Sequence, residues 1–232
     1  MLVNDDHGRT DGPTPSAVRT RWLFGTYDYP VSHRVVELVA ASTLLGFGLP
    51  WAASVWRGAS ERISAATVPL LLLVLTAAYA AADLASGTVH HLLDNHGSPD
   101  TPVIGQKFVK PFRDHHVDPL AMTHGDFIAV NADNMLVTLP VVITAAVLGD
   151  ARNHPYLHLF ALGLVVGVVL TNQIHKWAHL GEVPRTVRWL QHRGVILSPR
   201  HHAVHHSPPY DANYCITWGV VDVVLNRVVA RR

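Results

Sequence analysis

The chain has 232 residues, of which 49% are hydrophobic and only 15% charged, and its formal net charge is +1 with neutral histidines. A charge balance this close to zero excludes the strongly basic surface that nucleic-acid binding requires. The single cysteine, Cys215, excludes an internal disulfide framework and any metal site built from thiolates alone.

The first 30 residues are predicted to form a flexible polar arm. They are rich in aspartate and proline and lack the apolar core of a secretory signal peptide. Residues 31–232 are predicted to form one domain, in which the apolar residues are concentrated in long blocks.

Four uncharged or nearly uncharged blocks follow one another along this domain: Leu38–Trp56, Ala65–Ala82 with an apolar continuation to Val89, Met135–Gly149 and Tyr156–Thr171. The first two reach the roughly 18–20 residues that a membrane-spanning helix needs. The last two are shorter, and a buried helix or a re-entrant pair is their alternative. Either interpretation gives an even number of crossings, and we expect an all-α membrane bundle of about four helices.

The basic residues indicate the orientation of this bundle. Four crossings place 15 of the 18 lysines and arginines on one side of the membrane and leave Arg57, Arg62 and Arg152 on the other. Such a split predicts that the richer side, with both ends of the chain, is cytoplasmic. The strong preference for arginine over lysine favours a GC-rich bacterial genome, and hence a bacterial inner membrane.

The histidines gather on the same predicted cytoplasmic side, in several short motifs. "HKWAH" places His175 and His179 at i and i+4 on one helix face, where both rings reach one metal ion. Zinc metalloproteases have a glutamate as general base within such a motif, and this chain has Lys176 there.

"PRHHAVHHSP" packs four histidines between Pro199 and Pro208 and offers two further i,i+4 pairs, His201/His205 and His202/His206. A pH-sensitive surface patch is the alternative to a metal site. Of the two leading histidines, we expect His202 to bind metal directly.

Two further motifs combine histidine with carboxylate. "RDHHVDP" contains His115 and His116, for which a solvated loop is the alternative. "SGTVHHLLD" places His90 and Asp94 on one helix face, with Asp94 as a ligand or as a group that orients His90.

Eight imidazoles exceed the roughly four ligands of a single zinc site and therefore suggest two metal ions. Imidazole-rich coordination without thiolate suits non-haem iron, and zinc or copper are the alternatives. A histidine-rich cap on apolar helices points to oxygen chemistry on a lipid chain.

Several longer stretches, in order along residues 80–227, resemble the plasmanylethanolamine desaturase family, which also has a plant plastid acyl-lipid branch. They include "ADLASGTVHHLLD", "VIGQKFVKPFRDHHVDPLAMTHGDFIAVNADNMLVTLP", "TNQIHKWAH" and "ILSPRHHAVHHSPPYDANYCITWGVVDVVLN". The resemblance implies a membrane di-iron enzyme that uses O2 and two electrons from an external donor, resembling cytochrome b5 or ferredoxin. Its substrate would be the sn-1 O-alkyl chain of an ether phospholipid, and its product a vinyl ether.

The resemblance also implies roles for individual residues. The implied metal ligands are His90, His115, His116, His175, His179, His201, His202, His205 and His206. Residues implied to hold the ligands in place are Asp94, Asp118, Asp126, Asn131, Asp133 and Asn134. No catalytic residue is implied beyond the ligands. Lys110 and Arg113 are candidates to dock the lipid phosphate or the donor, with ordinary positive-inside charges as the alternative.

The chain departs from the family pattern at three places. Gly125 replaces a family histidine, for which His124 substitutes only if the loop is rotated by one residue. Tyr210-Asp211 replaces a His-Glu pair, and His91 replaces a tryptophan.

Other functions remain open on the residues alone. The first is an acyl-lipid desaturase or hydroxylase acting on an ester-linked chain. A membrane protein that binds metal or haem without catalysis is a second, although haem uses only one or two axial histidines. A membrane zinc hydrolase is a third, weakened by Lys176.

Overall fold

A computed structural model describes residues 20–22, 25–27 and 30–229 of the chain. Within these residues it has eight α-helices, with short helical turns η1 (Gly105–Val109) and η2 (Ala121–Thr123) and one hairpin of β1 (Thr20–Trp22) and β2 (Gly25–Tyr27). The predicted all-α class is therefore confirmed, with the small hairpin as an addition. The hairpin lies in the segment predicted to be a flexible arm, whose residues 1–19 lie outside the described residues.

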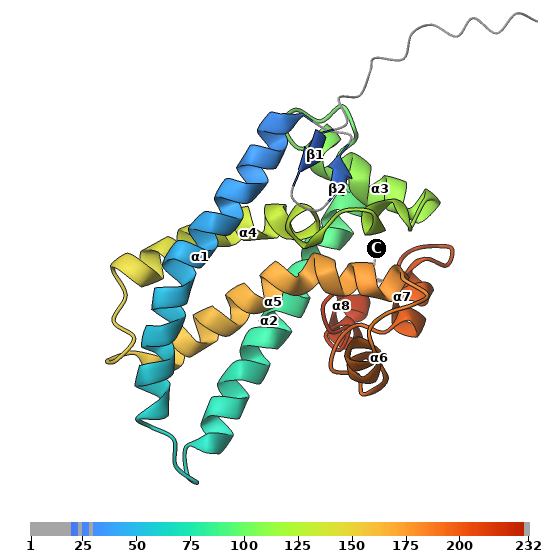
Figure 1. The fold of residues 1–232 in the computed structure, drawn as a ribbon. Coiled ribbons are helices and arrows are strands. Elements are labelled where there is room, and N and C mark those ends of the chain that lie inside the picture. Colours follow the sequence, from blue (N-terminus) through green and yellow to red (C-terminus); the bar gives the residue numbers. More distant parts are fainter. Residues whose placement is uncertain (1–19, 23–24, 28–29, 230–232) are drawn as a thin grey trace, which may run out of the picture.

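Four long helices form the body of the molecule (Figure 1): α1 (Val31–Ser60), α2 (Val68–Asn95), α4 (Phe127–Val147) and α5 (Pro155–His179). All four are long and apolar enough to cross a membrane. The two later apolar blocks are therefore complete spanning helices by length, because each helix extends beyond its apolar block into polar sequence. This result favours four crossings over the re-entrant alternative.

Four short helices gather at one end of the long ones (Figure 1): α3 (Lys110–Val117), α6 (Arg185–His192), α7 (Pro199–His205) and α8 (Asp222–Val229). They form a cap on the end where α2 and α5 finish. The cap is built from the two polar segments of the chain, and it is where the histidine motifs lie.

The long helices pack through small and apolar side chains. Helix α4 packs against α1 and α5, and α2 packs against α5. The core between α1, α4 and α5 contains Trp51, Met135 and Val165, all buried. Helices α2 and α4 thus lie against the same helix, α5.

The contact between α2 and α5 sets the register of the helix ends that carry His90 and His175. A Cβ added at Gly163 would lie 2.9 Å from the Cβ of Ala78, and one at Gly167 would lie 2.6 Å from that of Ala82. Small residues spaced in this way let membrane helices approach closely. Eight residues beyond Ala82 and Gly167, on the same faces, stand His90 and His175, whose ring centroids are 5.9 Å apart.

A buried carboxylate fixes the last loop of the cap to α2. Asp83 accepts backbone N–H bonds from Trp218 at 2.7 Å, Gly219 at 3.0 Å and Val221 at 3.2 Å. A fourth N–H bond comes from Thr217 at 3.3 Å. The carboxylate replaces water for these N–H groups, and it thereby holds the loop that carries Tyr214 and Cys215.

Candidate metal centre

Two groups of histidines converge at the capped end of the bundle, and each group is close enough to hold a metal ion. The first group contains His115, His175, His179, His202 and His206, and the second contains His90, His115, His116 and His205. The rings come from four elements: the end of α2, α3, the end of α5, and α7 with its C-terminal cap His206. His115 belongs to both groups, so the two groups are adjacent.

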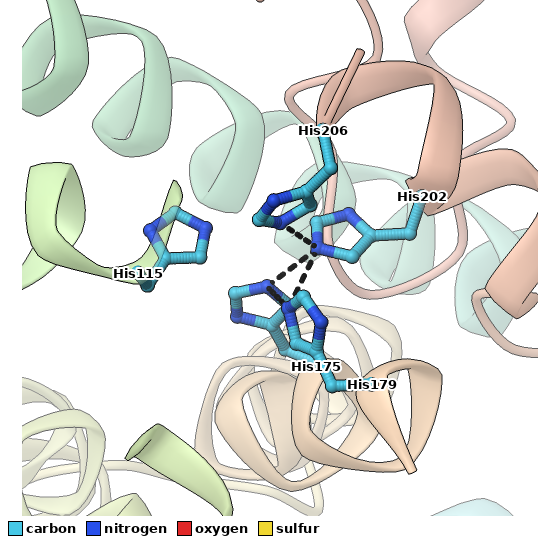
Figure 2. A group of neighbouring side chains, drawn as sticks. All are labelled: His115, His175, His179, His202 and His206. Carbon is cyan, nitrogen blue, oxygen red and sulfur yellow. Dashed lines mark hydrogen bonds between the residues drawn. The ribbon is translucent and has the colours of Figure 1, made fainter. Parts of the chain in front are cut away.

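Figure 2 shows the first group, in which four ring nitrogens face one another. The Nε2 atom of His202 lies 2.8 Å from that of His175 and 3.0 Å from those of His179 and His206. A ring nitrogen carries either one proton or one lone pair. One of these contacts at most is therefore satisfied by a hydrogen bond in a given tautomer.

A shared cation satisfies all of these contacts at once. Two nitrogens that each lie about 2.0–2.1 Å from one ion, at right angles to each other, are about 3.0 Å apart. The observed Nε2 separations of 2.8 to 3.0 Å agree with this spacing. The donor set of the first group thus fits a metal ion.

In the second group, backbone carbonyls determine which ring nitrogen faces inward. His90 donates its Nδ1–H to the carbonyl of Tyr214 at 2.9 Å, and His205 donates to that of Ala212 at 2.9 Å. His115 donates in the same way to the carbonyl of Phe112. The Nε2 atoms of all three rings are buried without a hydrogen-bond partner among the described residues. Each therefore presents a lone pair, the form in which histidine binds metal.

One carboxylate completes the second group. The Oδ2 atom of Asp94 lies 3.1 Å from Nε2 of His116 and 3.4 Å from Nε2 of both His90 and His205. Three imidazoles surround one oxygen, and the other oxygen, Oδ1, is buried without a hydrogen-bond partner in the described chain. Asp94 is thus placed to act as a ligand or to balance the charge of a bound cation.

The electrostatics of the cap favour neutral imidazoles. Burial lowers the pKa of His115 to about 4 and that of His206 to about 3, and neighbouring imidazoles add to both shifts. Burial also lowers the pKa of His202, assisted by His179. These rings are unprotonated at neutral pH and are available to a cation without first losing a proton.

His201 is the one implied ligand outside both groups. Its Nε2 lies 2.7 Å from Oδ2 of Asp222, and about a third of its side chain is exposed. His202, His205 and His206 share one face of α7, whereas His201 turns toward α8. The expected choice of His202 over His201 matches this placement.

Of the residues implied to hold ligands in place, Asp94 lies directly against three of the rings. Buried Asn131 accepts the backbone N–H of Gln173 at 3.0 Å and so ties α4 to α5 near His175. Asp126 caps α4 through the N–H of Ala129 and forms an ion pair with Arg34 on α1 at 2.7 Å. Asn131 and Asp126 thus join neighbouring helices to each other and do not contact the rings in these bonds.

The other three implied positions lie at the end of α3 and on α4. Asp118 is exposed at the end of α3, and its backbone alone bonds to that helix. Asp133 forms an ion pair with Lys107 at 3.1 Å, and Asn134 lines a cavity beside it.

The residues that depart from the family pattern also have definite places. His124 belongs to neither group of histidines, and the carbonyl of Gly125 accepts a hydrogen bond from Lys176 at 2.6 Å. Lys176 is thus a tie between α5 and the loop before α4, and it cannot serve as a general base there. The ring of Tyr210 packs edge-on to that of His116, with 5.1 Å between centroids.

Arg113 and Lys110 differ in their availability to a ligand. Arg113 donates to the carbonyl of Gly97 at 2.9 Å and so supports the loop after α2. Lys110 is half-exposed and forms an ion pair with Asp114 on the same helix. Lys110 is the more exposed of the two and therefore the stronger candidate for docking, and the role of Arg113 stays a prediction.

A cavity of about 520 Å³ lies between α2, α4 and α5 and reaches the histidines. His115 and His175 form part of its wall, and most of the remaining wall is apolar, including Val89, Phe112 and Val137. Sequence reasoning did not identify this cavity or Lys107 at its edge, because their positions depend on how three helices pack.

Comparison with known proteins places these features in a family context. The model of the lipid desaturase domain matches residues 79–230, which include all eight clustered histidines. The chain is 41% identical over 160 residues to plasmanylethanolamine desaturase of Myxococcus xanthus, covering 68% of this chain and 57% of that protein. It is 42% identical over 159 residues to plasmanylethanolamine desaturase 1 of Mus musculus, covering 65% and 58%.

A plant relative also matches. Chloroplastic fatty acid desaturase 4 of Arabidopsis thaliana is 38% identical over 154 residues, which cover 65% of this chain and 46% of the relative. The chain therefore spans less than three fifths of the length of these curated relatives. No solved structure matches it significantly.

Proposed function

The chain belongs to the lipid desaturase domain family, whose model matches more than half of it, and from this premise we propose that it is a membrane desaturase of ether phospholipids. The proposed substrate is plasmanylethanolamine, and the reaction introduces the 1,2 double bond into its sn-1 O-alkyl chain. The product is a vinyl ether, a plasmalogen. Two relatives named for plasmanylethanolamine desaturation support this substrate.

One observation carries the proposal: two adjacent imidazole groups adjoin an apolar cavity between membrane helices. We propose that the cavity receives the alkyl chain and that its C1 and C2 lie near His115 and His175. Desaturation of an unactivated chain requires a strong oxidant and a site that excludes water. The apolar wall provides the exclusion, and the buried rings hold the reactive group at a fixed place.

The proposed cofactor is a pair of non-haem iron ions. Their ligands would be His90, His115, His116, His175, His179, His202, His205 and His206, with Asp94 as a ligand or orienting group. Bound iron supplies the activation of O2 that amino-acid side chains cannot. In the balanced reaction, the alkyl ether loses two hydrogens, O2 accepts them with two further protons and two electrons, and two waters form.

The protein's own residues set the geometry for this chemistry. The carbonyls of Tyr214, Ala212 and Phe112 fix three rings in the tautomer whose Nε2 is free of a proton. Asp94 balances positive charge at the second group. We propose that His201 takes no part as a ligand and supports α7 through Asp222.

The two electrons come from a small external donor protein, resembling cytochrome b5 or ferredoxin. Half-exposed Lys110 on α3 is the proposed contact for such a donor or for the lipid phosphate. We further propose that residues 31–232 act as one domain in a bacterial inner membrane, with the histidine-rich cap on the cytoplasmic side. The 15-to-3 division of basic residues supports that orientation.

An acyl-lipid desaturase is the second candidate, because the chloroplastic relative is named a fatty acid desaturase. A single assay separates the two functions. The purified protein, reconstituted in bilayers with iron, O2 and a chemical reductant, receives a 1-O-alkyl and a 1-acyl phosphoethanolamine lipid in equal amounts. Our proposal predicts that only the alkyl lipid is converted, to an acid-labile vinyl ether. Formation of an acid-stable alkene in the acyl lipid would instead support the acyl-lipid desaturase.

A further inference from the structure

The wall of the cavity next to the histidines has buried and exposed parts. In the buried part, His115 and His175 are only 6% and 4% exposed. Among its other wall residues, Lys107 and Asp133 have side chains that are 49% and 42% exposed. The cavity thus has a buried, imidazole-lined part, and its exposed wall residues include the charged Lys107 and Asp133 beside apolar Val89 and Val137.

The two charged wall residues form an ion pair between two separate elements. Nζ of Lys107, on η1, lies 3.1 Å from Oδ1 of Asp133, on α4. Asp133 stands six residues beyond Phe127, about 9 Å along the helix from its first residue. For a helix that begins at the membrane surface, that depth lies near the boundary between the head-group layer and the hydrocarbon core. An ionisable residue on a spanning helix facing a cavity usually marks a ligand path.

A third polar group lies beside the pair. Asn134 also lines the cavity, and its Nδ2 atom is buried without a hydrogen-bond partner among the described residues. A buried amide donor of this kind costs free energy unless a partner arrives. An oxygen atom of a ligand in the cavity would supply that partner.

We propose that Lys107, Asp133 and Asn134 bind the zwitterionic head group of a phosphoethanolamine lipid. The Lys107 ammonium binds the phosphate, which leaves Lys110 to the electron donor. The Asp133 carboxylate binds the primary ammonium, and the Asn134 amide donates to an oxygen of the glycerol backbone. The inference rests on the proposed function and extends it to head-group selection. Lys107 is opposite in charge to the lipid phosphate, and Asp133 is opposite in charge to the lipid ammonium. When the lipid binds, the Lys107–Asp133 ion pair is therefore replaced by two ion pairs between protein and lipid, and the net charge of the site does not change.

The proposal predicts which lipids bind well. A phosphoglycerol lipid carries the phosphate but offers no cation to Asp133. A phosphocholine lipid carries a cation that cannot donate a hydrogen bond. Both should therefore bind more weakly than the ethanolamine lipid, although all three share the same alkyl chain.

Three variants of the full-length protein in bilayer nanodiscs test this prediction. Retention of 1-O-alkyl phosphoethanolamine and phosphoglycerol lipids is measured by native mass spectrometry, and KM and kcat are measured for both. Asp133→Asn should reduce the preference for ethanolamine by about two- to fivefold, the effect of one partly exposed charge contact, and the change should appear in the ratio of the two KM values. Lys107→Met should weaken both lipids alike, and Asp133→Glu should restore the preference.

Asp114→Asn is the matched control, because Asp114 also forms an ion pair with a lysine near the cavity but does not line it. It should leave the preference unchanged. A preference that persists in Asp133→Asn, or that falls equally in Asp114→Asn, overturns the proposal. The binding readout keeps this outcome separate from the proposed function, which fails instead if no lipid yields a vinyl ether while the head-group preference is present.

Discussion

Replacing Asp94 with asparagine should remove one metal ion and leave the other. The Oδ2 atom of Asp94 faces Nε2 of His116 at 3.1 Å and those of His90 and His205 at 3.4 Å. Loss of such a contact to metal-binding histidines typically lowers metal affinity by about 10- to 100-fold, which corresponds to about 1.4–2.7 kcal/mol. Three rings share this carboxylate, so the upper part of that range is expected.

The four mutually close rings of the first group have no contact with Asp94 and should keep their ion. Iron content of the purified Asp94→Asn variant is measured by mass spectrometry during titration with a chelator of graded strength. The unmodified protein should release about two ions together, whereas the variant should release one at a lower chelator concentration. The division of the histidines into two sites would be refuted if the variant released both ions at the same chelator concentration. It would also be refuted if the variant released its iron just as the unmodified protein does.

Three further predictions concern the cap and its support. His202→Asn should strip iron from the first group and abolish activity, whereas His201→Asn should retain the iron; metal analysis of both variants compares them. Gly167→Leu should push α5 away from Ala82, since even a Cβ there would lie 2.6 Å from the Ala82 Cβ, and should lower both thermal stability and iron content. Because the folded pKa of His115 is lowered to about 4, below its usual value of about 6.5, its contribution to metal-free stability is complete above pH 6.5. That contribution should decline as the pH falls toward 4, and the decline should be smaller in His115→Gln when followed by thermal unfolding.

The spanning helices and the cap were predictable because their signals are local. Long uncharged blocks specify helices in a membrane whatever their neighbours, and His175 with His179 needs only the helical repeat to share a face. The even number of crossings then brought two distant histidine segments to one side. His90 follows Ala82 by eight residues, and His175 follows Gly167 by eight residues. This equal spacing aligns the two histidines, but it can be recognised only once the contact between Ala82 and Gly167 is known.

The finer features depend on tertiary contacts. The different roles of His201 and His202 arise from the rotation of α7 relative to α8, which a run of adjacent histidines does not specify. Backbone carbonyls such as that of Tyr214 carry no side-chain signal, so their role in orienting His90 was not predictable. The pairing of Lys107 with Asp133 joins positions 26 residues apart, and it depends on how the loop before α3 folds over α4.

The iron content of protein that is forming vinyl ether tests the central claim most directly. Full-length protein is purified, its iron is quantified per chain, and conversion of a 1-O-alkyl phosphoethanolamine lipid is followed in the same preparation with O2 and reductant. The account predicts about two irons per chain in proportion to activity, and parallel loss of both after chelation. Vinyl ether formation that persists in iron-free protein would contradict it.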